Sequence, residues 1–132
     1  MAALDTKVLV RYLVRDDARQ QATARNFIRQ CVAQGQPLFI PVTVTLELEW
    51  VLRSNFKFAK TSIIETLAAL LSTQELSFES ESAVELALRQ YAEHSADFSD
   101  CMHLALAAQA GHLPLGTFDR AAAKLDGAKL LV

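Results

Sequence analysis

Residues 37–53 read PLFIPVTVTLELEWVLR and join a short strand to a helix without an intervening loop. The two prolines enclose the apolar triplet 38–40, and a run of this length bounded by turn residues is typical of a buried strand. Behind Pro41 the apolar spacing changes to that of a helix, for which Thr43 is a suitable N-cap. The predicted buried stripe of that helix consists of Val44, Leu48, Val51 and Leu52.

Short apolar runs and helical patterns alternate in the same way on both sides of this stretch. No Asn-Gly or similar hairpin signal separates the runs, so we expect parallel strands joined by helical crossovers. The predicted class is α/β, a three-layer sandwich with a central parallel sheet of about five short strands flanked by helices. We expect strands near 2–6, 37–41, 75–78, 113–117 and 129–132, and helices over 7–15, 18–33, 43–52, 60–71, 80 or 82–93, and 97 or 99–110.

Length and composition favour one globular domain spanning residues 1–132. Of its residues, 52% are hydrophobic and 21% are charged, a balance that is typical of a folded core and argues against disorder. No apolar stretch approaches the ~20 residues of a membrane span, and no secretory leader is recognisable, so we expect a soluble cytoplasmic protein. Cys31 and Cys101 are expected to be buried, reduced thiols.

Acidic residues stand where predicted strands end or helices begin. Carboxyl ends of parallel strands share one edge of a sheet, so we expect these acids to converge. Only one of Glu47 and Glu49 can face that edge, because two helical steps turn a side chain by about 200°. Asp97 has the alternative of a helix N-cap, and Glu49 that of a surface acid paired with Arg53. The candidate acids are Asp5, Asp97, Asp100, Asp119 and one of the two glutamates.

Grouped carboxylates without His or Cys partners favour Mg²⁺ or Mn²⁺ over zinc and indicate metal-assisted phosphodiester hydrolysis. The net charge of −2 disfavours a general nucleic-acid binder but allows a local basic rim. Trp50 is expected in the core, although it, Phe56 or Phe58 would also be able to stack on bases or meet a partner. Basic residues spaced by four predict one basic helical face, either solvated or RNA-facing: Lys7, Arg11, Arg15 and Arg19.

Four segments, LDTKVLVRYLVRDD, PVTVTLELEWVLR, DFSDCMHLALAAQAG and GTFDRAAAKLDGAKLL, occur in the order and spacing of the PIN-domain family. The chain resembles most narrowly the VapC-type toxins of toxin-antitoxin pairs. The resemblance implies a PIN-like fold and a Mg²⁺- or Mn²⁺-dependent ribonuclease with a cognate VapB-like antitoxin and commonly a homodimer. It also implies the site residues: the acids Asp5, Glu47, Asp100 and Asp119, with Asp97 as an adjunct, and the hydroxyl residues Thr6 and Thr117.

One position departs from the family pattern. The family commonly has asparagine two residues after its first acid, where this chain has Lys7. The ammonium group would compete with the metal, hold a phosphate, or point to solvent. If the ammonium competes with the metal, the alternative hypothesis is a catalytically impaired PIN scaffold that only binds protein or RNA. A phosphoacceptor receiver domain would need an acidic pair after the first strand, which offers only Asp5. Candidates for guiding the RNA backbone are Arg11, Arg15, Arg53 and Arg120.

Overall fold

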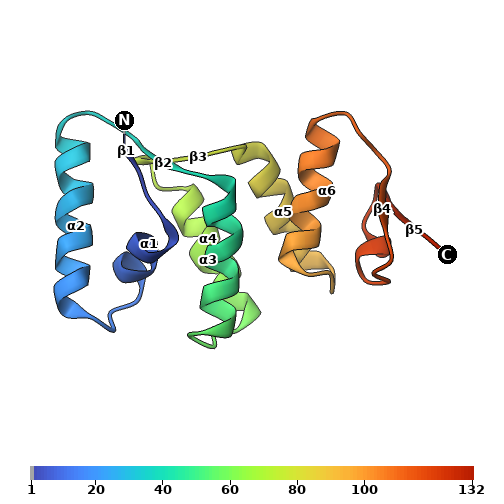
Figure 1. Ribbon diagram of the computed structural model, residues 1–132, viewed down its shortest axis with the longest axis horizontal. Coiled ribbons are helices and arrows are strands. Elements are labelled where there is room, and N and C mark those ends of the chain that lie inside the picture. Colours follow the sequence, from blue (N-terminus) through green and yellow to red (C-terminus); the bar gives the residue numbers. More distant parts are fainter. Residues whose placement is uncertain (1) are drawn as a thin grey trace. The chain divides into compact units, whose positions relative to one another are not determined.

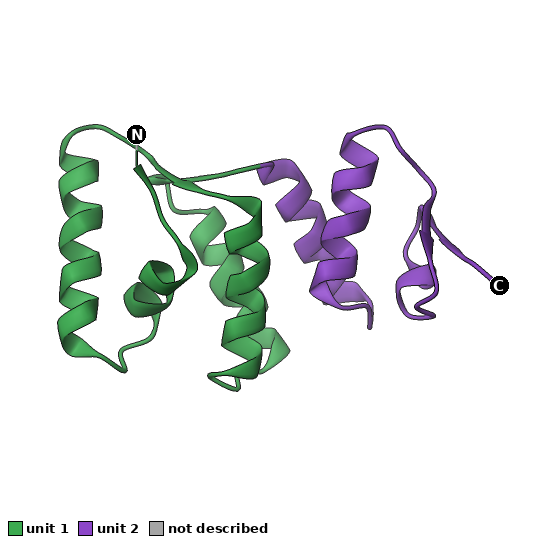
Figure 2. Ribbon diagram, in the orientation of Figure 1, with its two compact units in different colours: residues 1–79 green, residues 80–132 purple. Residues whose placement is uncertain are grey.

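The computed structural model describes residues 2–132, which divide into two compact units, one ending at Glu79 and the other spanning Ser80–Val132 (Figure 2). The first unit contains β1 (Ala2–Ala3), α1 (Thr6–Leu13), α2 (Ala18–Ala33), β2 (Leu38–Ile40), α3 (Val42–Ser54), α4 (Lys60–Leu71) and β3 (Leu76–Phe78). The second contains α5 (Glu81–Glu93), α6 (Phe98–Gln109), β4 (Leu115–Thr117), the short helix η1 (Ala122–Lys124) and β5 (Ala128–Leu130).

The first unit is built on a parallel sheet in the order β1-β2-β3. Leu38 and Ile40 of the central strand are fully buried, as the triplet between the prolines predicts. Helix α1 packs against both α2 and α3, while α2 contacts β2 and α4 contacts β3 (Figure 1). These contacts hold the end of β1 and the start of α1 beside α3.

The second unit pairs α5 with α6 and the strand β4 with β5, again in parallel. Tyr91 of α5 and Phe98 of α6 meet edge to face, with ring centroids 5.3 Å apart. Gly111 takes a left-handed conformation (φ 79°) just after α6, where a helix commonly ends on glycine. The chain then returns through β4, whose carboxyl end precedes Asp119.

The α/β class and the parallel strands are confirmed, but the strands do not form one five-stranded sheet. The described residues place three strands in the first unit and two in the second. Apolar runs reveal that a strand is buried, and they carry no information on which strand is its neighbour.

The helix starts show where local signals were incomplete. Helix α3 begins at Val42 with Pro41 as its N-cap, so the prediction of Thr43 was wrong. The backbone N–H of Val42 instead donates to Oε1 of Glu79, 2.8 Å away, at the end of β3. A carboxylate from a distant segment therefore stabilises this helix start. Such a cap is invisible to a local search for Ser, Thr, Asp or Asn.

The four basic residues expected on one helical face do not share a helix. Helix α1 ends at Leu13 with Val14 extended, and α2 starts only after Asp17, whose side chain accepts from the Gln20 N–H. Arg15 thus lies in the connection between the two helices, on neither helical face. Asp5 is the N-cap of α1 and Asp17 is the N-cap of α2, so the two helices begin separately.

Helix α3 reverses the expected placement of two side chains. Trp50 is 53% exposed, whereas Glu49 is only 4% exposed, so the core position for Trp50 and the surface position for Glu49 were both wrong. Glu49 accepts from Arg53 at 2.9 Å, which confirms the predicted pairing. The charge-assisted bond makes burial of the carboxylate tolerable. Cys31 and Cys101 are buried and free, as expected.

No helix among residues 2–132 combines the length and apolar character needed to cross a membrane.

Candidate active site

Asp5 lies between the end of β1 and the start of α1. Its side chain is the N-cap of α1, and Oδ1 accepts a hydrogen bond of 3.1 Å from the backbone N–H of Val8. The residue is exposed, while its neighbours Leu4 and Thr6 are buried and hold the backbone in place. The strand-to-helix junction therefore presents a fixed carboxylate to solvent.

Glu47 comes to the same place from α3. The hydroxyl of Thr6 donates a hydrogen bond to Oε1 of Glu47, which ties the start of α1 to the second turn of α3. Glu47 is exposed and Glu49 buried, so the structure distinguishes the two glutamates in the direction that the resemblance implies. Contacts between α1 and α3 support this pairing.

These residues line a hollow of about 390 Å³ in the first unit. Acidic, basic and aromatic side chains share it, a mixture that suits a ligand carrying both phosphate and base. A second hollow, of about 700 Å³, also includes Asp5, Lys7 and Arg11 and extends along α2 past Arg19. The first hollow is lined by Asp5, Thr6, Lys7, Val10, Arg11, Glu47, Val51, Asn55 and Phe56.

The second unit holds the other three acids. Asp97 precedes α6, Asp100 lies in its first turn, and Asp119 follows β4. Burial raises the pKa of Asp100, and the negative charges of Asp119 and Asp97 raise it further, while His103 acts in the opposite direction. Asp97 makes no side-chain capping hydrogen bond, so the alternative that it serves only as an N-cap has no support.

The conformation around Asp119 is fixed by local hydrogen bonds. Its backbone N–H donates to Oγ1 of Thr117 at 3.0 Å, and its Oδ1 accepts from the N–H of Ala122 at 2.8 Å. Thr117 therefore sets the turn after β4, and Asp119 accepts from the first residue of η1. This is a structural role for the hydroxyl that the resemblance singled out.

The acids occur as two groups, Asp5 with Glu47 in the first unit and the three aspartates in the second. Within residues 2–132, no three His, Cys, Asp or Glu side chains form a group that could hold a metal ion. One oxygen each of Asp5, Glu47 and Asp119 accepts an internal hydrogen bond, and the other oxygen accepts none from the described residues. The carboxylates are thus oriented while one oxygen remains available.

The four arginines proposed to guide RNA differ in their surroundings. Arg11 binds Asp16 at 3.3 Å and also donates to Gln20, and Arg53 binds the buried Glu49. Arg15 and Arg120 are exposed and form no ion pair with the described residues. Only the latter two can turn toward a phosphate without giving up a partner.

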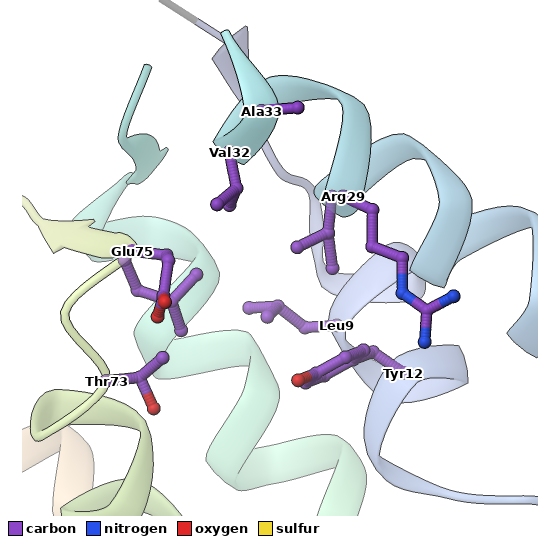
Figure 3. Close-up of a pocket in the computed structure, with 9 residues that line it drawn as sticks. Leu9, Tyr12, Arg29, Val32, Ala33, Thr73 and Glu75 are labelled. Atoms are coloured by element: carbon purple, nitrogen blue, oxygen red, sulfur yellow. The ribbon is translucent and has the colours of Figure 1, made fainter. Parts of the chain in front are cut away.

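Sequence reasoning missed a cavity of about 360 Å³ between α1, α2 and the segment leading into β3. Figure 3 shows Leu9 between Arg29 on one side and Glu75 on the other, with the Tyr12 hydroxyl directed toward Thr73. None of the predicted site residues lines it. The signal in the sequence was weak, because helix α2 carries few buried residues and so shows no clear apolar face.

Fold and acids together define a class of protein. The chain belongs to the PIN domain family, which it matches over residues 2–128. It is similar to the VapC ribonuclease of Aquifex aeolicus (strain VF5), with 26% identity over 125 residues, covering 95% of this chain and 92% of that protein. The family resemblance drawn from the four sequence segments is confirmed.

Proposed function

We propose that the chain is a metal-dependent endoribonuclease that hydrolyses phosphodiester bonds in RNA, as the toxin of a VapBC-like toxin-antitoxin pair. Membership of the PIN family and the similarity to a protein named VapC ribonuclease support this function. The family match continues across both units, which supports a single PIN domain over residues 1–132. The proposal places the protein in the cytoplasm.

The observation that carries the proposal is the way in which the acids are held. Asp5, Glu47 and Asp119 each commit one oxygen to an internal hydrogen bond and keep the other available. Carboxylates that ligate a metal are commonly oriented by such hydrogen bonds. Asp17 is oriented in the same way at the start of α2, but it lies outside the hollow that Asp5 and Glu47 share.

The donor set fits Mg²⁺ or Mn²⁺ in its chemistry, because all candidate ligands are hard carboxylate oxygens. The residues proposed to hold the ion are Asp5, Glu47, Asp100 and Asp119, with Asp97 as an adjunct. A bound ion would supply a water of lowered pKa and positive charge for the transferring phosphoryl group. Burial raises the pKa of Asp100 most, and repulsion from Asp119 and Asp97 raises it further; a cation would relieve the repulsive part.

The remaining site residues are proposed to position these groups and the substrate. Thr6 orients Glu47, and Thr117 sets the turn that carries Asp119. Lys7, Arg15 and Arg120 are exposed cations that would draw the RNA backbone toward an acidic centre. Arg11 and Arg53 would join them only by leaving Asp16 and Glu49.

A VapB-like antitoxin and a second copy of the chain are the proposed protein partners, on the strength of the resemblance to VapC toxins. The antitoxin would block the site, and the chain would act as a homodimer. Size-exclusion chromatography with light scattering on the purified chain tests the dimer. Copurification with the product of an adjacent small gene, followed by loss of ribonuclease activity, tests the antitoxin.

The decisive experiment is cleavage of single-stranded RNA by the purified full chain with Mn²⁺, with Mg²⁺ and with EDTA. We expect internal cleavage only with metal, and none by the Glu47→Gln variant. An Asp17→Asn variant is the matched control, since Asp17 also caps a helix but lies outside the hollow. RNA binding without cleavage in every condition would favour the impaired scaffold. Absence of both RNA binding and cleavage would refute the ribonuclease.

A further inference from the structure

The solvent-facing side of α3 carries an aromatic residue directly beside the candidate acid Glu47. Trp50 follows Glu47 by three positions, and side chains at this spacing are neighbours on a helix, about 5 to 6 Å apart at Cβ. Both residues are exposed, whereas Val44, Leu48 and Leu52 turn the opposite side of the helix into the core. Trp50 is the only tryptophan in the chain.

A single exposed apolar side chain is ordinary in a folded protein and has no meaning by itself. Trp50 differs because of what surrounds Glu47. The hollow beside that acid also contains Phe56 as a second aromatic residue and Lys7 as a cation with no partner among the described residues. Aromatic faces next to cations are the arrangement by which proteins hold single-stranded nucleic acid.

Helical geometry gives the order of Trp50, Glu47 and Val51 around the axis of α3. Seen from Glu47, Val51 lies about 40° to one side and Trp50 about 60° to the other. Val51, Asn55 and Phe56 line the hollow, so Trp50 continues its rim on the opposite side of the acid. A strand of RNA crossing α3 at Glu47 would therefore pass between Trp50 and the hollow that Phe56 lines.

We propose that Trp50 forms a stacking subsite for the base of a nucleotide adjoining the phosphodiester that is cleaved at Glu47. The proposal rests on the ribonuclease function argued above and adds a substrate-binding residue to it. Stacking needs only the face of a base, so the subsite favours unpaired RNA and tolerates any sequence. A stacked base also quenches or shifts the fluorescence of the indole it covers.

The test uses the intrinsic fluorescence of Trp50 in the full chain, which has no other tryptophan to obscure it. EDTA prevents cleavage while a single-stranded oligoribonucleotide is titrated. We expect a saturable fluorescence change, and a much smaller change with an abasic oligonucleotide of equal length and charge. This readout needs no substitution and is unaffected by any folding defect of a variant.

Variants provide the second readout. Trp50→Ala is expected to raise KM by at least about fivefold with kcat nearly unchanged, and Trp50→Phe is expected to restore most of the loss. Thr43→Ala is the control, because Thr43 is exposed on the same side of α3 one turn before Glu47. Circular dichroism checks that each variant is folded.

Three outcomes would overturn the inference. The first is an active enzyme whose fluorescence does not change on RNA binding and whose KM is unaltered in Trp50→Ala. This result would show that Trp50 does not contact RNA, and the ribonuclease function would still hold. A Trp50→Ala variant that changes oligomeric state at unaltered KM would make this face a protein interface. Absence of both RNA binding and cleavage in the parent would refute the ribonuclease and the subsite together.

Discussion

The Thr6 hydroxyl donates a hydrogen bond to Oε1 of Glu47, a residue 41 positions further along the chain. Thr6 is buried and Glu47 exposed, so the bond connects the interior of the first unit to a surface carboxylate. Because it holds one oxygen, it also decides where the other one points.

Thr6→Val removes this donor with little change in side-chain volume. We expect metal affinity or kcat to fall by roughly 10- to 100-fold, the usual effect of losing a partner that orients a ligand. Thr6→Ser should restore activity. Thr45→Val is the matched control, since Thr45 is fully buried in α3 but donates only to a backbone carbonyl. Equal loss in both valine variants would indicate a packing effect instead.

Asp5 combines a cap with a proposed metal ligand, and substitutions can separate the two. Asp5→Asn should abolish cleavage with little change in stability, because asparagine is also a good N-cap. Asp5→Ala should abolish cleavage and lower the free energy of unfolding by about 1 kcal/mol. Cleavage assays and thermal melts measure both effects. An active Asp5→Asn variant would remove Asp5 from the ligand set.

The two glutamates of α3 should respond in opposite ways. Glu47→Gln should eliminate metal-dependent cleavage at nearly unchanged Tm, because Glu47 is exposed. Glu49→Gln should remain active but lose about 1 to 2 kcal/mol of stability, because it weakens a charge-assisted bond to Arg53. Urea titration gives the stability change. Inactive Glu49→Gln beside active Glu47→Gln would reverse the assignment.

Lys7 lines the same hollow as Asp5 and Glu47 and is exposed to solvent. Removing its charge with Lys7→Asn should tighten Mn²⁺ binding, by no more than about fivefold because water screens exposed charges. Titration calorimetry compares it with Lys129→Asn, a control on β5. Unchanged affinity would mean that the ammonium points away from the acids. Tighter binding without faster cleavage would show that competition between Lys7 and the metal does not limit the chemical step.

The raised pKa of Asp100 predicts a pH-dependent stability in EDTA. The folded chain binds this proton more tightly than the unfolded chain does, so the free energy of unfolding decreases as pH rises from the unfolded to the folded pKa. Asp100→Asn should therefore be more stable than the parent at pH 7, by less than about 1 kcal/mol after solvent screening, with the advantage vanishing at low pH. Melting curves across pH would contradict this if the gap were constant.

Local patterns were enough to predict much of this protein. Helices α2 and α4 have the predicted bounds, because their apolar spacing and flanking turn residues act within a few positions. The candidate acids could also be predicted locally, because they directly follow predicted strands or begin predicted helices. Family membership was recognisable for the same reason, since four segments keep their order and spacing.

Tertiary structure alone decided the contacts between distant segments. Glu79 begins α3 at Val42, and Thr6 orients Glu47, through hydrogen bonds that no sequence period encodes. The same holds for the burial of Glu49 and the exposure of Trp50. Periodicity placed Val44, Leu48 and Leu52 on the inner face of α3, but Glu49 and Trp50 lie at the border of that face. Packing against α1 and α4 decides which of these two is buried.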